Sequence, residues 1–334
     1  MRIKGFILIL AVSLAVCGKL DAAEQTWHLK DGQNWQQVGQ GKGSDFLMAV
    51  ADAKQLVSSG KTGSAKKAFA KIKKDYPQIA GADFDAYVKA EIFYSQRKYD
   101  KASASYDKFT EDYPQSQFYQ PALEREYQIA TAYLNGRKRT VLGVFKLKAY
   151  EDGAEIMGKI ADKAGDAPIA KNALLTVAQS NEKRGEHYEA YMNWSDIEGR
   201  WPTGQIGKDA LLGMARSLEN DYRGPKYDSK VLESSRSYYT EYQKRYENTA
   251  AELAIPKKIS RIDEELAEKE LAVADYYART ESYNSAILYY QKIIETWPNS
   301  SSAKSAEQKL AALEKKQREL AQKKKKINWK GLIL

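Results

Sequence analysis

The sequence predicts an all-α protein built as a solenoid of helix pairs, and three observations support this prediction. The 334 residues include only 8 Pro and 21 Gly, and 29% of them are charged, a composition that favours long helices. Dipeptides of an aromatic residue and proline recur along the chain, and the same residue types precede each dipeptide at the same distances. Such a repeat can bury a continuous apolar face between neighbouring units without one dense hydrophobic block.

Four copies of the repeat end in an aromatic residue followed by proline. These dipeptides are Tyr76-Pro77, Tyr113-Pro114, Trp201-Pro202 and Trp297-Pro298. An aromatic or aliphatic residue stands four and seven positions before each of them and an alanine stands eleven before, which places all three on one helix face. The alanines are Ala65, Ala102, Ala190 and Ala286. A fifth copy without proline has Ser235 at the alanine position, and Tyr239, Tyr242 and Tyr246 follow it in the same register.

Twelve positions before each of the four alanines of the proline-containing copies stands another alanine, inside a second amphipathic segment. These residues are Ala53, Ala90, Ala178 and Ala274. Each copy is therefore predicted to be a helix pair whose axes approach closely at the two small residues. Together with the proline after the second helix, this spacing resembles the 34-residue tetratricopeptide repeat. The resemblance covers most of residues 45–312 and implies a right-handed superhelix of about five to six repeats, with a concave groove lined by the first helices.

Two stretches depart from the regular spacing. Between Pro114 and Pro202 there is room for one more pair, which we expect over Pro121–Leu134 and Tyr150–Lys163, joined by the basic loop Asn135–Lys148. A second insertion, Tyr222–Tyr227, lengthens the turn of the fifth pair. Long turns often carry contacts, although an exposed turn also simply tolerates insertion.

The amino terminus has the features of an export signal. Two positive charges precede an apolar run over Gly5–Val16 that is too short to span a bilayer, so residues 1–16 are predicted to be a signal peptide. Residues 17–44 follow as an N-terminal segment, in which Asp31-Gly32 favours a short hairpin before a linker.

The single cysteine lies at the end of the apolar run. The segment Leu14–Gly18 resembles the bacterial lipoprotein box, which implies that Cys17 becomes the lipidated N-terminus and anchors the chain to a membrane. Val16 departs from the small residue that usually precedes the cysteine in this box. The alternative is ordinary cleavage after Gly18 or Ala23, which would remove Cys17.

The carboxyl terminus is strongly basic. After a capping helix expected over Ala303–Leu320, residues 313–334 are predicted to form a basic tail that holds much of the net charge of +9. Its densest part is Lys323, Lys324, Lys325 and Lys326. These residues are predicted to contact anionic lipid headgroups or an acidic partner. The alternative is a frayed and solvated helix end.

The sequence contains no arrangement typical of an active site. With one Cys and two His in the chain we expect no metal site, and His187 falls where the repeat places an aromatic residue, which favours a packed imidazole. Clusters of acidic residues follow predicted helix faces without the apolar surroundings that would shift a pKa. We therefore expect a protein that is not an enzyme, with no cofactor and no small-molecule substrate.

The export signal, the predicted lipid anchor and the tetratricopeptide-like helix pairs together resemble the BamD-type outer-membrane assembly lipoproteins. The closest local likeness lies in Leu271–Tyr277, Tyr283–Ala286 and Trp297-Pro298. The resemblance implies an exported scaffold on the periplasmic face of the outer membrane, whose partners are a β-barrel assembly scaffold, unfolded outer-membrane proteins or both, and not nucleic acid. The alternative is a periplasmic scaffold for envelope division or polysaccharide export.

The second helix pair has the most specific candidate binding site. Counted in the tetratricopeptide register, the groove-facing positions of its first helix are Phe84, Tyr87, Glu91 and Tyr94. The internal positions are already filled by Ala86, Ala90 and Phe93. We therefore expect the aromatic stripe to bind an extended, aromatic-rich segment, with Glu91 accepting a backbone or basic donor. The alternative is that these rings pack against Trp27 and Trp35 of the N-terminal segment.

Overall fold

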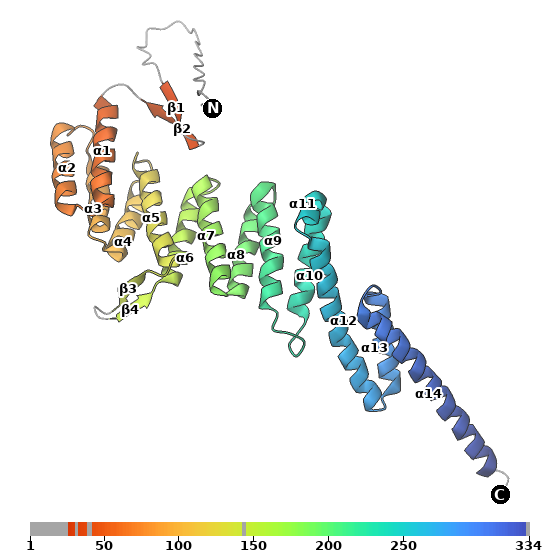
Figure 1. Cartoon of the computed structure of the whole chain (residues 1–334). Helices are drawn as coiled ribbons and strands as arrows, with labels where there is room; N and C mark the ends of the chain where they lie inside the picture. Colours follow the sequence, from red (N-terminus) through yellow and green to blue (C-terminus); the bar gives the residue numbers. More distant parts are fainter. Residues whose placement is uncertain (1–25, 31–32, 39–41, 142–144, 332–334) are drawn as a thin grey trace, which may run out of the picture. The chain divides into compact units, whose positions relative to one another are not determined.

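The computed structural model describes residues 26–30, 33–38, 42–141 and 145–331, with side chains for residues 43–139 and 145–322. It confirms the predicted fold class, since the described residues form 14 helices and only two short strand pairs. Most helices pack side by side with the next one along the chain, as successive pairs (Figure 1). The chain divides into two compact units, one ending at Tyr119 and the other beginning at Gln120.

The first unit contains a strand pair and two helix pairs. Strands β1 (Thr26–Lys30) and β2 (Gln33–Val38) pair antiparallel in the segment for which the sequence predicts a hairpin. The helices are α1 (Lys42–Ser58), α2 (Thr62–Asp75), α3 (Ala82–Ser95) and α4 (Tyr99–Asp112). Their largest buried side chains are aromatic: Phe46, Phe69, Phe84, Tyr87, Tyr106, Phe109 and Phe118.

The second unit contains one strand pair and the remaining helices. Its first pair is α5 (Tyr119–Leu134) and α6 (Tyr150–Ala164), separated by strands β3 (Lys138–Val141) and β4 (Phe145–Lys148). The following helices are α7 (Pro168–Arg184), α8 (His187–Arg200), α9 (Gly204–Asp221), α10 (Lys230–Arg245), α11 (Glu247–Glu252), α12 (Ile255–Arg279), α13 (Tyr283–Thr296) and α14 (Ser301–Gly331). Helix α14 packs on both α12 and α13 and so covers the last pair.

The core of the second unit is continuous because single helices serve two neighbouring clusters. Helix α9 contributes Met214 to the cluster formed with α6, α7 and α8, and it contributes Leu211 to the cluster formed with α10 and α12. Helix α12 likewise contributes Leu266 to that second cluster and Ala274 to the cluster formed with α13 and α14. Each pair therefore buries apolar surface on both sides, as expected of a stacked repeat.

The small residues found in the sequence lie where the two helices of each pair meet. All eight alanines are fully buried: Ala53, Ala65, Ala90, Ala102, Ala178, Ala190, Ala274 and Ala286. In the irregular α5/α6 pair Gly153 takes this role, because an added Cβ would lie 2.9 Å from the carbonyl oxygen of Ala130. In the α9/α10 pair it is Ser235, whose hydroxyl donates to the carbonyl of Ala215 at 2.8 Å.

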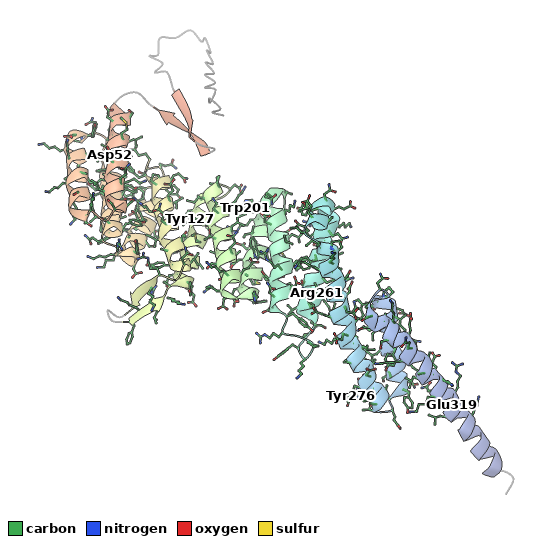
Figure 2. All side chains as sticks on the ribbon, in the orientation of Figure 1. Asp52, Tyr127, Trp201, Arg261, Tyr276 and Glu319 are labelled. Atoms are coloured by element: carbon green, nitrogen blue, oxygen red, sulfur yellow. The ribbon has the colours of Figure 1, made fainter. Side chains whose placement is uncertain are left out.

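The aromatic-proline dipeptides end the second helix of each regular pair. The backbone N–H of Trp201 still donates to Ile197 at 2.9 Å, and that of Trp297 donates to Ile293 at 3.0 Å. The following proline has no N–H and disfavours helical geometry in the residue before it, so the helix stops there. The indole N–H of Trp201, which is labelled in Figure 2, also donates to Asp166 at 2.8 Å.

The structure departs from the sequence-based expectations in two places. The basic segment expected as a loop over Asn135–Lys148 contains the antiparallel strands β3 and β4, in which Lys138 pairs with Lys148 and Val141 pairs with Phe145. Helix α14 runs on to Gly331, whereas the capping helix was expected to end at Leu320. Its length is consistent with the run of Lys residues after Leu320, because Lys is a good helix former.

Introducing a charge at an alanine contact tests the proposed packing. Replacing Ala102 with Glu puts a carboxylate between α3 and α4 where no space or partner exists, and should lower the free energy of unfolding by about 3 kcal/mol or more. Lys108→Glu, on the exposed face of the same helix, should change it by less than about 0.5 kcal/mol. Urea denaturation followed by circular dichroism measures both. Equal midpoints for Ala102→Glu and the unmodified chain would contradict the packing.

Candidate functional site

The residues predicted to line a groove on α3 are instead part of the core of the first unit. Phe84 is 1% exposed, and Tyr87 and Glu91 are 0% exposed. The ring of Phe84 lies 5.6 Å from that of Phe46, and Tyr87 stacks on Phe118 at 4.8 Å. The prediction that Phe84, Tyr87 and Glu91 face an open groove is therefore wrong. Two aromatic side chains that the repeat pattern does not predict, one on α1 and one just before α5, cover that face of α3.

The other predicted groove features also have internal partners. The carboxylate of Glu91 accepts a hydrogen bond from the hydroxyl of Tyr106 at 2.7 Å, within its own helix pair. Tyr94 is half-buried with its ring edge-on to Tyr99 at 5.3 Å. The side chains of Trp27 and Trp35, the alternative packing partners, lie outside the described residues.

Three further sequence-based expectations concern the ends of the chain and the histidine. Cys17 lies outside the described residues, so its lipidation stays a prediction. Lys323–Lys326 belong to helix α14, but their side chains are also outside the described part, and their contact with lipid or an acidic partner stays a prediction too. His187 is half-buried at the first position of α8.

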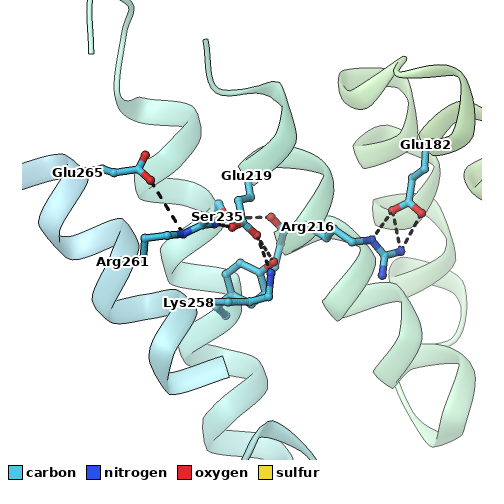
Figure 3. Close-up of polar contacts among 9 residues, drawn as sticks. Glu182, Arg216, Glu219, Ser235, Lys258, Arg261 and Glu265 are labelled. Carbon is cyan, nitrogen blue, oxygen red and sulfur yellow. Dashed lines mark hydrogen bonds and ion pairs between the residues drawn. The ribbon is translucent and has the colours of Figure 1, made fainter. Parts of the chain in front are cut away.

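A recurring carboxylate joins successive helix pairs of the second unit, and sequence reasoning missed it. Glu182 of α7 accepts from the indole N–H of Trp194 in its own pair at 3.0 Å and from Arg216 of the next pair at 2.7 Å (Figure 3). Asp275 of α12 similarly accepts from Tyr290 at 2.7 Å and from Lys309 of α14 at 2.6 Å.

The same arrangement joins α9 to α12. Glu219 accepts from the hydroxyl of Tyr239 in its own pair and forms ion pairs with Lys258, at 3.3 Å, and with Arg261. Burial raises the pKa of Tyr239 to about 12, so this phenol stays protonated and donates throughout the physiological range. Each carboxylate therefore links two neighbouring elements of the second unit and helps to fix their relative orientation.

One cleft of about 350 Å³ lies between the end of α5, the start of α6 and the last turns of α7. We call it the α5–α7 cleft. Its lining residues are Thr131, Leu134, Asn135, Tyr150, Thr176, Gln179, Ser180, Lys183 and Arg184. The lining contains two cations and no carboxylate. The guanidinium of Arg184 lies 4.3 Å from the centre of the Tyr150 ring.

Two buried polar atoms in this cleft have no hydrogen-bond partner among the described residues. They are Nε of Arg184 and the hydroxyl oxygen of Thr131. A buried donor without an acceptor is costly, and a bound acceptor removes that cost. With the positive charges of Lys183 and Arg184, the α5–α7 cleft is suited to an acidic or carbonyl-rich segment of another protein.

A second cleft of about 400 Å³ has the opposite charge. We call it the α9–α12 cleft; it is lined by Tyr222, Arg223, Gly224 and Pro225 of the lengthened turn and by Glu265 and Glu268 of α12. Burial and the two carboxylates raise the pKa of the Tyr222 phenol, whose hydroxyl has no partner within the described part of the chain. This cleft is suited to a basic or donor-rich segment.

One carboxylate of α12 caps the start of helix α14. Glu264 accepts hydrogen bonds from the backbone N–H groups and the hydroxyls of Ser301 and Ser302, at 2.7 to 3.1 Å, and so caps the first turn of α14. Burial acts to raise the pKa of Glu264, but these four hydrogen bonds together lower it below its ordinary value.

None of the described helices is long and apolar enough to cross a membrane. Within the described ranges, no three or more His, Cys, Asp or Glu side chains gather into a group that could hold a metal ion.

Comparison with known proteins gives two family matches. Residues 214–332 match the outer membrane lipoprotein family YfiO, and residues 87–116 match a tetratricopeptide repeat. No curated protein matches the chain. Similar solved structures include PilW, a widely conserved type IV pilus biogenesis factor, at 16% identity over 78% of this chain and 97% of that chain, with a TM-score of 0.29. Another is the C-terminal part of a repeat-containing protein from Cytophaga hutchinsonii, at 15% identity, 77% and 98% coverage and a TM-score of 0.19.

These findings agree with the resemblances stated from the sequence. The chain is a helix-pair solenoid with a tetratricopeptide-repeat match at residues 87–116, and it resembles the BamD-type outer-membrane lipoproteins from residue 214 in α9 through α14. The matches support a protein-interaction scaffold in the cell envelope. The α9–α12 cleft lies within the matched part of the chain.

The capping role of Glu264 predicts a pH-dependent contribution to stability. Glu264→Gln should lower the free energy of unfolding by about 1 to 2 kcal/mol at pH 7, because an amide is a weaker acceptor than a carboxylate. A carboxyl whose folded pKa is lowered stabilises the fold above its unfolded pKa, and this contribution is lost as pH falls through the folded value.

The measurement is thermal unfolding of variant and unmodified chain between pH 7 and pH 3. The difference should be full above about pH 5 and shrink toward pH 3. Glu252→Gln, at an exposed position of α11, serves as control and should show no such trend. A difference that is independent of pH would contradict the assigned role.

Proposed function

We propose that this chain is a non-enzymatic scaffold of outer-membrane β-barrel assembly, which binds a barrel scaffold protein and unfolded outer-membrane protein segments on the periplasmic face. The observation that carries the proposal is the match of residues 214–332 to an outer membrane lipoprotein family, in the same part of the chain that forms the α9–α12 cleft. The proposal includes export by residues 1–16 and anchoring through Cys17.

The α9–α12 cleft is the proposed site for the barrel scaffold. Its carboxylates, Glu265 and Glu268, lie beside the hydroxyl of Tyr222, which has no partner of its own within the described residues. A basic segment that entered would pair with both carboxylates and satisfy the phenol. Because α12 is held to α9 by Glu219, the two walls of the cleft are already in place before a partner arrives, which lowers the entropic cost of binding.

The α5–α7 cleft is the proposed site for client segments. An unfolded chain offers backbone carbonyls and acidic side chains, which match the donors of Lys183, Arg184 and Thr131. This assignment replaces the stripe on α3, whose residues are buried. The opposite charges of the two clefts would keep client and scaffold at separate places.

Co-purification tests the proposed function. The full chain, isolated from its native membrane with mild detergent, should bring with it a β-barrel protein that carries POTRA domains. Glu265→Lys combined with Glu268→Lys should reduce recovery of that protein at least tenfold, because the cleft would then repel a basic segment. Glu111→Lys combined with Glu252→Lys, at exposed acidic positions of α4 and α11, is the charge-matched control and should leave recovery unchanged.

The result also separates the proposal from its alternative. Absence of a β-barrel protein, with recovery of division or polysaccharide-export proteins instead, would overturn the assembly role. Equal recovery by the double variant and the control would leave the assembly role standing and would show that the α9–α12 cleft is not the contact.

Lipid anchoring is tested independently. If Cys17 is modified, the mature chain begins at Cys17 and partitions with membranes, because several acyl chains give stable attachment where one gives only marginal binding. Intact-mass spectrometry should show the added mass, and Cys17→Ser should release the chain into the soluble periplasmic fraction. A mature N-terminus at Lys19 or Glu24 would exclude the anchor.

A further inference from the structure

The strands β3 and β4 form a hairpin that leaves the helical array between α5 and α6 (Figure 1). Asn135 and Tyr150, on either side of the hairpin in the chain, line the α5–α7 cleft. The segment from Asn135 to Ala149 contains five cations, Arg137, Lys138, Arg139, Lys146 and Lys148, and no acidic residue. All four residues of β4 are exposed. This hairpin is an insertion in the repeat, and neither cleft described above uses its strands.

The two sides of β4 differ in chemistry. Successive residues of a strand point to opposite faces, so Phe145 and Leu147 share one face, and Lys146 and Lys148 share the other. Phe145 is 61% exposed and Leu147 is 57% exposed. The antiparallel register adds Lys138, opposite Lys148, to the lysine face, and it adds Arg139, opposite Leu147, to the other face, where Arg139 forms an ion pair with Asp152. The hairpin therefore presents two exposed apolar side chains on one face and three lysines on the other.

Two contacts tie the base of the hairpin to α6 of the second unit. Arg139 forms an ion pair with Asp152 of α6, and the ammonium of Lys148 lies 5.4 Å from the centre of the Tyr150 ring. A two-stranded hairpin is only marginally stable in water, and exposed apolar side chains add nothing to it. A surface that buried Phe145 and Leu147 would stabilise the hairpin.

We propose that this hairpin docks on the surface of a bilayer containing anionic phospholipids, with Phe145 and Leu147 inserted at the level of the headgroups. Two apolar side chains suit shallow insertion at an interface, while the long lysine side chains extend to the phosphates. Basic residues close to an apolar insertion are typical of contacts with anionic lipid. Protein interfaces, in contrast, are depleted of lysine. This membrane contact is additional to the proposed assembly function and does not depend on it.

The experiment uses the full mature chain with Cys17→Ser, which removes both the anchor and the only cysteine. Leu147→Cys in this background is labelled with an environment-sensitive fluorophore and mixed with vesicles of phosphatidylcholine containing phosphatidylglycerol. We expect a blue shift of the emission and quenching by lipids that carry a spin label near the headgroup. Vesicles of phosphatidylcholine alone should give at least a tenfold smaller response.

Two matched positions serve as controls. Lys146→Cys lies on the opposite face of the same strand, and Leu288→Cys lies on α13 and is equally exposed. Both labels should remain in a polar environment. In a separate vesicle-flotation measurement, Phe145→Ser combined with Leu147→Ser should reduce binding of the unlabelled Cys17→Ser chain at least threefold. We expect the residual binding of this variant to come from the basic end of α14.

Three results would overturn the proposal. One is an unshifted Leu147→Cys emission in the presence of anionic vesicles to which the chain binds. Another is an equal shift at Lys146→Cys, which would show that the two faces are not distinguished. The third is a shift at Leu147→Cys with periplasmic protein but not with vesicles, which would make the hairpin a protein-docking element.

Discussion

The close approach of the two helices in each pair, through side chains no larger than serine, is the constraint on which the rest of the array depends. Where both helices carry alanine the contact is direct, and every one of those alanines is fully buried. Where the chain departs from the regular spacing, Gly153 or Ser235 occupies the same place. Because these contacts leave no room for adjustment, they set the face that each helix turns to its neighbours, and the aromatic and aliphatic residues four and seven positions further along are buried as a consequence.

The contact between pairs uses different chemistry from the contact within them. In the second unit the first helix of each later pair supplies a carboxylate that accepts from an aromatic donor of its own pair and from a cation of the next pair, as Glu182, Glu219 and Asp275 do. A partly buried carboxylate needs both partners, since it would otherwise be desolvated without compensation. The arrangement thus makes the angle between pairs depend on specific side chains, whereas apolar burial alone would permit several angles.

The spacing of small and aromatic residues was enough to predict the fold class and the helix pairs, because the alanine contacts require small residues at that spacing. It was not enough to predict the candidate sites. The α3 stripe is covered by Phe46 and Phe118, and the repeat pattern predicts an aromatic residue at neither position. The linking carboxylates stand at different distances from the small residue, one position after Ala274 but four after Ala178, so no fixed offset reveals them. The β3–β4 strands are four residues each, too short for alternation to stand out against a basic loop.

The two clefts exist where the repeat is interrupted, and this explains how a stacked array acquires distinct sites. A regular pair has no spare backbone with which to form a cavity, because its turns are short and its faces are covered by its neighbours. The insertion after α5 separates α5 from α6 in the chain and leaves Thr131 and Arg184 with unsatisfied polar atoms at the α5–α7 cleft. The lengthened turn after α9 places Tyr222 over α12 and forms the wall of the α9–α12 cleft.

In both clefts the helix pairs on either side hold the polar groups in position, so the energetic cost of an unsatisfied donor or phenol cannot be relieved by local rearrangement. A partner that supplies the missing acceptor or cation is therefore bound by a surface that is already formed, and the specificity of each site comes from the insertion while its rigidity comes from the repeat.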